Sequence, residues 1–315
     1  MKKILSLILC LAMLTSVIAG CAATDSPETT QATVGVDPNY DPVNNDKTLK
    51  VLGIGNSFSV DTMHFLEDIA RAEGFESVAL GNLYISGCKL QTHAANAAGN
   101  LPAYKFYMNY DGQWTTIEGC TLEYALKNQD WDIITMQQGS SNSGEAATYE
   151  PYLTQLIEYV NKTKTNPNAR LAWNMTWAYQ SDFEKSMFDH YDRDQMKMYN
   201  AIIDTVKSTV VPHTEFSYIM PVGTAIQNAR TSYVGDTLTR DGYHLSELGR
   251  VIGSYTWLAT FMGKPLEAIN ITQVSSTLIL TDADKAIIME SVNAALAENF
   301  AITNSAHTEV AGGAS

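Results

Sequence analysis

Basic residues are scarce in this sequence of 315 residues, which has 20 lysines and arginines against 34 aspartates and glutamates. The formal net charge at pH 7 is −14. Proteins that bind nucleic acid cluster basic side chains against the phosphates, and no such cluster stands out here. The same shortage argues against a polybasic segment that would hold the chain at an anionic membrane surface. We therefore expect no nucleic-acid partner.

Cysteine is also rare, with four residues in the chain. Cys10 and Cys21 lie near the N-terminus, which leaves Cys88 and Cys120 for the rest of the molecule. A domain of this size folds without a disulfide, so two free buried thiols are favoured, and a disulfide is the alternative for an exported protein. The acidic segment at residues 189–192 contains a histidine, but no metal-ligand spacing recurs elsewhere. We expect neither a metal nor a cofactor.

The N-terminus has the pattern of an export signal. Two lysines precede an apolar run over residues 4–18, which is too short and too close to the N-terminus for a comfortable membrane span. The run ends in IAGC at residues 18–21, which resembles the lipobox of bacterial lipoproteins. That resemblance implies cleavage before Cys21, diacylation of its thiol and anchoring at the outer face of a bacterial membrane. An ordinary cleaved signal peptide is the alternative.

Composition divides the chain into four parts. Residues 1–20 are the predicted signal peptide, and residues 21–47 are rich in Thr, Ser, Pro, Asp and Asn, which predicts a flexible tether. Residues 48–300 have the length and apolar content of one α/β domain. Residues 301–315 are expected to be a disordered tail.

Short apolar runs alternate with helical periodicities through the predicted domain. This alternation predicts a three-layer α/β sandwich around a mostly parallel, five-stranded sheet. The segment from Leu90 to Tyr107 is expected to be mostly helical, and Asp111-Gly112 predicts a hairpin turn. In parallel sheets of this kind, ligands bind beyond the carboxyl ends of the strands. The predicted strands cover residues 49–54, 78–85, 131–136, 170–175 and 216–220.

The residues that follow the first three predicted strands are polar or glycine. Ser57 lies at a strand-to-helix turn, where a serine is either a nucleophile or a simple helix cap. Gly87 follows the second strand and can expose a backbone N–H, although a plain turn glycine is equally consistent. Gln137 and Gln138 follow the third strand and offer amide donors, or merely make the loop polar.

A fourth segment lies just ahead of a late helix, where Asp241 and His244 are three residues apart. Together, these segments resemble the sequence blocks of SGNH (GDSL-like) hydrolases. Gly55-Asn56-Ser57 resembles the first block, with Asn56 in place of the usual aspartate, and Gly87 matches the glycine of the second block. The third block departs from the pattern, because Gln137-Gln138-Gly139-Ser140 is more similar to the Gln-Gly-Glu-Ser of carbohydrate-ester deacetylases. The resemblance covers about residues 49–262 and is closest to the DUF4886-type family, whose members carry Gly-Asn-Ser-Phe-Ser and Arg-Asp-Gly-Tyr-His-Leu.

The resemblance implies a catalytic set. Ser57 would be the nucleophile, His244 its base, and Asp241 the group that orients the imidazole. The oxyanion hole would consist of the N–H groups of Ser57 and Gly87 and the side-chain amide of Gln138, which aligns with the family's asparagine better than Gln137 does.

The implied activity is that of a serine esterase acting on O-acyl, chiefly acetyl, esters of carbohydrate. Asn56, Trp177 and Tyr243 are the expected substrate contacts. Trp177 belongs to an aromatic group with Trp173 and Tyr179, which suits sugar rings or, alternatively, core packing. Two other functions stay open: an esterase or thioesterase for lipid acyl chains, and a carbohydrate-binding surface lipoprotein without catalysis.

Overall fold

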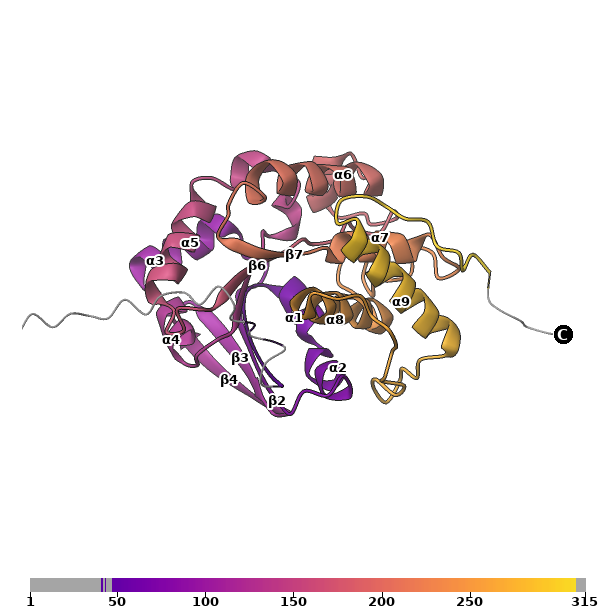
Figure 1. The fold of residues 1–315 in the computed structure, drawn as a ribbon. Helices are drawn as coiled ribbons and strands as arrows, with labels where there is room; N and C mark the ends of the chain where they lie inside the picture. Colours follow the sequence, from indigo (N-terminus) through magenta and orange to yellow (C-terminus); the bar gives the residue numbers. More distant parts are fainter. Residues whose placement is uncertain (1–40, 42, 44–46, 310–315) are drawn as a thin grey trace, which may run out of the picture. The chain divides into compact units, whose positions relative to one another are not determined.

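The computed structural model describes residues 41, 43 and 47–309 (Figure 1). The predicted signal peptide, Cys21, most of the predicted tether and residues 310–315 lie outside the described residues. Within the described part, no helix combines the length and the apolar character that a membrane span requires.

A seven-stranded sheet forms the centre of the domain, in the order β4-β3-β2-β1-β5-β6-β7. Five strands run parallel to one another and correspond to the five predicted strands, so the predicted α/β class with a mostly parallel sheet is confirmed. The prediction of five strands was too low, because β3 and β4 add an antiparallel hairpin beside β2. The strands are β1 (Thr48–Gly55), β2 (Ser77–Tyr84), β3 (Tyr104–Tyr110), β4 (Gln113–Cys120), β5 (Ile133–Met136), β6 (Arg170–Asn174) and β7 (Phe216–Met220).

Helices cover both faces of the sheet, which gives the expected three layers. Helices α3, α4 and α5 lie on one side of the sheet, and α1, α2 and α8 lie on the other (Figure 1). The central strands are buried between these layers, and all four residues of β5 are buried. The helices are α1 (Ser57–Met63), α2 (Leu66–Ala72), α3 (Leu90–Gly99), α4 (Leu122–Lys127), α5 (Tyr152–Thr163), α6 (Gln195–Thr205), α7 (Val222–Arg230), α8 (Glu247–Met262) and α9 (Asp282–Ala297).

The segment expected to be helical from Leu90 to Tyr107 is helical only in its first part. Helix α3 ends at Gly99, and Asn100 caps it in the left-handed conformation with φ of 44°. The chain then enters β3 and turns back into β4 at the predicted Asp-Gly turn. Asp111 and Gly112 both have positive φ values, 50° and 85°, as a type I′ hairpin turn requires.

The C-terminal segment differs from the predicted disordered tail over residues 301–309. The N–H of Thr303 donates to Asn228 Oδ1 on α7 at 2.8 Å. The carbonyl of His307 accepts from the N–H of Tyr233 at 2.9 Å. These hydrogen bonds hold the segment against Asn228 on α7 and against Tyr233 just after that helix, so this part of the chain differs from the predicted disordered tail.

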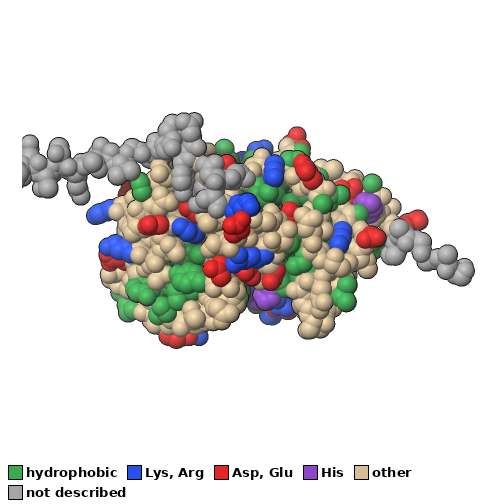
Figure 2. All heavy atoms as spheres, turned by 60° about the horizontal axis from the view of Figure 1, so that its bottom comes forward, with side chains coloured by type: hydrophobic (Ala, Val, Ile, Leu, Met, Phe, Trp, Pro, Cys, Tyr) green, Lys and Arg blue, Asp and Glu red, His purple; other side chains and the backbone are tan. Residues whose placement is uncertain are grey.

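Both cysteines of the described chain, Cys88 and Cys120, are free and buried, as the favoured alternative predicted. Burial raises the pKa of the Cys88 thiol to about 12 and that of Cys120 to about 11. On the face shown in Figure 2, acidic and basic side chains are interspersed, and apolar side chains gather toward the side where Figure 1 shows the β3–β4 hairpin.

Candidate active site

Ser57 and His244 meet at the carboxyl edge of the sheet. Ser57 is the first residue of α1 and follows the end of β1 after one intervening residue, and His244 lies in the loop between α7 and α8. Although 187 positions separate them in the sequence, His244 Nε2 lies 2.8 Å from Ser57 Oγ. Both residues are partly accessible to solvent, so a substrate can reach the hydroxyl.

Asp241 holds the imidazole from the other side. His244 Nδ1 lies 2.7 Å from Asp241 Oδ2, and the N–H of His244 donates to Asp241 Oδ1 at 2.8 Å. Partial burial works to raise the pKa of Asp241, but the hydrogen bonds from the His244 ring and backbone lower it overall. An ionised Asp241 accepts a hydrogen bond from the Nδ1–H group, which leaves Nε2 without a proton and free to accept from the Ser57 hydroxyl. The geometry is that of a Ser–His–Asp triad.

Asp61 is a buried carboxylate that ties the His244 loop to the helix of Ser57. Its side chain is 1% exposed and lies on α1, four residues after Ser57. It accepts from Arg240 Nη1 at 3.0 Å, from Arg250 Nε at 2.8 Å and from the N–H of Leu245 at 2.9 Å. Because Arg240 and Leu245 flank the loop that carries Asp241 and His244, the carboxylate fixes that loop relative to Ser57. Asp61 was not among the residues predicted from the sequence, although an acidic residue one helical turn after Ser57 could have indicated it.

Trp177 supports the same loop from inside the protein, which corrects its predicted role as a substrate contact. The side chain is fully buried, its indole N–H donates to the Tyr243 carbonyl at 2.7 Å, and its ring stacks on Phe58 at 4.1 Å. Trp173 and Tyr179 are also buried, so the core-packing alternative holds for this aromatic group. These rings do not face a substrate.

Tyr243 is the expected substrate contact that stays accessible. It is half-buried, and its ring centroid lies 3.9 Å from that of His244. This position beside the imidazole is consistent with its predicted role.

Asn56, the second expected substrate contact, is instead a buried helix cap. Only 1% of the residue is exposed. Its Oδ1 accepts from the N–H of Phe58 at 2.9 Å, and its Nδ2 donates to the Cys88 carbonyl at 3.1 Å. The asparagine thus starts α1 and fixes the Gly87–Cys88 turn beside the nucleophile, and it is not free to contact a substrate.

A chain of buried side-chain hydrogen bonds continues inward from Asn56. Gln137 Nε2 donates to Asn56 Oδ1 at 2.8 Å, and Gln137 Oε1 accepts from Asn174 Nδ2 at 2.9 Å. Asn174 Oδ1 in turn accepts from the indole N–H of Trp257 on α8 at 3.0 Å. A buried network whose members are paired in this way is rigid, so it holds the start of α1 in place. Asn174 and Trp257 were not predicted from the sequence, because nothing in their local sequence indicates this pairing.

Gln138 does not offer the oxyanion donor that was predicted. Its side chain is buried, and its Oε1 accepts from the N–H groups of Leu90 and Gly139 at 3.0 and 2.9 Å. Its Nε2 donates to the backbone and side-chain oxygens of Thr148 at 3.2 and 3.1 Å. These bonds commit the amide to the loop after β5. Gln137, the alternative oxyanion donor, likewise uses its Nε2 in the hydrogen bond to Asn56.

Two backbone N–H groups remain available near the nucleophile. Ser57 is the first residue of α1, so its N–H has no acceptor within the helix. Gly87 is exposed, with φ of 60°, and no hydrogen bond among residues 47–309 uses its N–H. The bond from Asn56 to Cys88 keeps the Gly87 turn next to Ser57. This part of the predicted oxyanion hole is consistent with the structure.

Comparison with known proteins identifies the family. The family model described as Domain of unknown function (DUF4886) matches residues 50–277. The chain belongs to the DUF4886 family. The crystal structure of a DUF4886 family protein from Bacteroides uniformis superposes with a TM-score of 0.75 and 34% identity, over 83% of this chain and 100% of that one. No curated protein matches the chain.

More distant structures include a putative SGNH hydrolase from Slackia heliotrinireducens, with a TM-score of 0.45, 19% identity and coverage of 68% of this chain and 98% of that one. An acetylxylan esterase from Geobacillus stearothermophilus has a TM-score of 0.42 and 12% identity, over 68% of this chain and 94% of that one. Neither likeness is close enough to bear on the activity of this DUF4886 protein. The matched DUF4886 region contains Ser57, Asp241 and His244, and the predicted family membership is confirmed.

Proposed function

We propose that this DUF4886 protein is a serine esterase that hydrolyses O-acyl esters, chiefly acetyl esters, of carbohydrate. The observation that carries the proposal is the contact between Ser57 Oγ and His244 Nε2 at 2.8 Å, with Asp241 behind the imidazole at 2.7 Å. Three residues with these roles, brought together from distant parts of the chain, are what nucleophilic catalysis at an ester requires.

The geometry suggests the order of events. Ser57 Oγ attacks the ester carbonyl while His244 Nε2 takes its proton, and Asp241 stabilises the imidazolium that forms. The imidazolium then protonates the departing alkoxide, which leaves an acyl group on Ser57. Water, activated by the same imidazole, hydrolyses this acyl-enzyme. The N–H groups of Ser57 and Gly87 are the proposed donors to the oxyanion.

The proposed location is the outer face of a bacterial membrane. Lipid on Cys21 would anchor the chain, and residues 22–40 would tether the domain so that it can reach its substrate. Val43, within the predicted tether, is buried in the core and so belongs to the domain. The intact triad favours catalysis over the alternative of a silent carbohydrate-binding lipoprotein.

Covalent labelling tests the proposed nucleophile. A fluorophosphonate probe should add its mass to the peptide that contains Ser57, and Ser57→Ala should abolish the labelling. His244→Ala should slow it by orders of magnitude, because the hydroxyl loses its base. Ser86→Ala removes a nearby exposed serine and is the matched control. Undiminished labelling of the Ser57→Ala protein would refute the assignment.

A further inference from the structure

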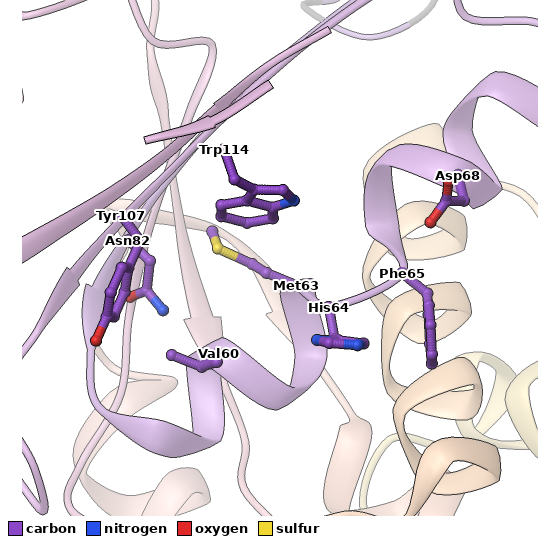
Figure 3. Close-up of a pocket in the computed structure, with 8 residues that line it drawn as sticks. All are labelled: Val60, Met63, His64, Phe65, Asp68, Asn82, Tyr107 and Trp114. Atoms are coloured by element: carbon purple, nitrogen blue, oxygen red, sulfur yellow. The ribbon is translucent and has the colours of Figure 1, made fainter. Parts of the chain in front are cut away.

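A cavity of about 460 Å³ lies between α1 and the part of the sheet formed by β2, β3 and β4. Figure 3 shows Val60 and His64 on the helix at one side, Asn82 and Tyr107 on the strands at the other, and Trp114 across the top. The antiparallel hairpin therefore builds a wall of this cavity, which the parallel strands alone would not provide.

The cavity begins one helical turn from the nucleophile. Ser57, Val60 and His64 lie at positions i, i+3 and i+7 of the chain and follow one face of the helical segment that begins at Ser57. With a rise of 1.5 Å per residue, Val60 lies about 4.5 Å along the axis from Ser57. A molecule with its ester at Ser57 can therefore extend into the cavity.

Asn82 is a buried polar side chain with an unpaired amide atom at this cavity. It is 2% exposed, and its Oδ1 accepts from Ser59 Oγ at 3.0 Å. Among residues 47–309, its Nδ2 has no hydrogen-bond partner, and it points toward the cavity in Figure 3. Leaving a buried amide unpaired is costly, so the arrangement favours a ligand that completes the hydrogen bond.

The size and polarity of the cavity point to the occupant. An acetyl group has three heavy atoms and fills little of 460 Å³, so the cavity suits the alcohol part of an acetyl ester. A long acyl chain would fill the space but has no polar atom to pair with Asn82. A sugar hydroxyl both donates and accepts, so it pairs with an amide in either orientation. Trp114, which is 52% exposed, and Tyr107 offer aromatic surfaces to the C–H faces of a sugar ring.

We infer that this cavity is the subsite for the pyranose ring that carries the ester, with Asn82 bound to a ring hydroxyl and Trp114 against the ring. The inference rests on the proposed esterase function and adds the residues that select its alcohol. His64 and Asp68 are exposed at the rim and supply further polar groups to the hydroxyls.

The test compares kcat/KM for a panel of O-acetylated methyl pyranosides with kcat/KM for ethyl acetate, which has no ring. In the Asn82→Leu and Trp114→Ala proteins, the ratio of the two values should fall at least about tenfold for one or more of the sugars, which corresponds to loss of one good contact. Tyr124→Ala removes an exposed aromatic side chain on α4, away from the cavity, and should leave the ratio unchanged.

Three outcomes would overturn the inference. Equal losses on both substrates would mean that the variants only damage the fold. An unchanged ratio for every sugar would mean that the ring binds elsewhere, and losses confined to an octanoyl ester would identify an acyl subsite.

A binding measurement separates this inference from the proposed function. Saturation-transfer NMR of the Ser57→Ala protein with the unacetylated methyl pyranosides should show binding that Trp114→Ala weakens at least about tenfold. If no ester is hydrolysed but this binding is present and lost in the variant, the esterase proposal fails and the sugar subsite stands. If the Ser57→Ala protein binds none of the sugars, the subsite is refuted.

Discussion

Asp61 carries a negative charge into the interior, one helical turn below Ser57, and two arginines and a backbone N–H surround it. Asp61→Asn removes the charge and leaves Arg240 and Arg250 without their counterion. Loss of one partner from a buried ion pair costs about 3–5 kcal/mol of unfolding free energy, and we expect the lower end because Arg240 is 41% exposed. Displacement of the His244 loop should also lower kcat, by roughly 10²-fold.

The exposed pair of Asp189 and Arg193 is the matched control for Asp61. Its two atoms lie 2.6 Å apart, but both side chains are about half exposed. Asp189→Asn should therefore change the unfolding free energy, measured by denaturant titration, by no more than about 1 kcal/mol. If both variants had the same small effect, Asp61 would not be the residue that fixes the His244 loop relative to Ser57.

His93 makes the stability of the domain depend on pH. The residue is fully buried on α3, and burial lowers its pKa to about 4. The unfolded chain takes up the proton near pH 6.5, so between about pH 6.5 and pH 4 the unfolded state binds one more proton than the folded state. The unfolding free energy should therefore fall by about 2 kcal/mol from pH 7 to pH 5 because of His93 alone.

Denaturant titration at the two pH values checks this prediction. In His93→Gln, the difference in unfolding free energy between pH 7 and pH 5 should be smaller by that amount. Substitution of the exposed His190 by Gln should leave this difference as in the wild type. An unchanged slope in His93→Gln would contradict the account of the buried imidazole.

The sequence allowed the triad to be predicted because its three members lie in short motifs that resemble the blocks of SGNH hydrolases. Ser57, Asp241 and His244 stood in recognisable local patterns, and the structure brings them together. The roles of Asn56 and Gln138 could not be read in the same way. An amide serves equally as an oxyanion donor, a helix cap or a loop anchor, and only the partners of its four hydrogen-bonding sites distinguish these roles. Those partners, such as Thr148 and Cys88, are set by the tertiary fold.

At the scale of elements, the β3–β4 hairpin is the main addition to the parallel sheet. Its turn depends on Gly112, whose φ of 85° is strained for any residue with a Cβ, although a Cβ there would meet nothing closer than 3.9 Å. Gly112→Ala should therefore cost about 1–2 kcal/mol through backbone strain alone. Thermal unfolding should show a fall in Tm of roughly 2–8 °C. Thr115→Ala, on the neighbouring strand, is the control, and an equal effect there would show that the turn conformation is not the cause.

Four of the parallel strands, β1, β2, β5 and β6, were predictable because each is an apolar run that is mostly buried on both faces. The edge strand β7 is less buried but has the same kind of short, largely apolar run. β3 was not, because its strand state depends on pairing with β2, in which Ala79 lies opposite Tyr110. Local periodicity does not report such long-range pairing, and strand preference depends strongly on context. The prediction of the Asp-Gly turn was nevertheless correct, because it depends on two adjacent residues and not on distant pairing. The contacts of the C-terminal segment could not be predicted from local sequence either, because its partners Asn228 and Tyr233 are about 75 positions away in the sequence.

At the scale of the whole molecule, the account predicts an acidic domain held to a membrane by a lipid on Cys21. Cys21→Ser should prevent lipidation. The protein should then either no longer partition into detergent with the membrane fraction, or accumulate as the unprocessed precursor. Cys10→Ser, within the apolar run, should leave processing and partitioning unchanged. A Cys21→Ser protein that is still processed and membrane-bound would show that the IAGC segment is not a lipobox.

The central claim is that Ser57 and His244 act as one catalytic unit on ester substrates. The most direct measurement is kcat for a short-chain acetyl ester in the wild type, Ser57→Ala, His244→Ala and the double variant. Each single substitution should lower kcat by several orders of magnitude, roughly 10⁴–10⁶-fold, and the double variant should be little worse than either one, because the second loss removes nothing that still functions. Full activity in the Ser57→Ala protein would contradict the account.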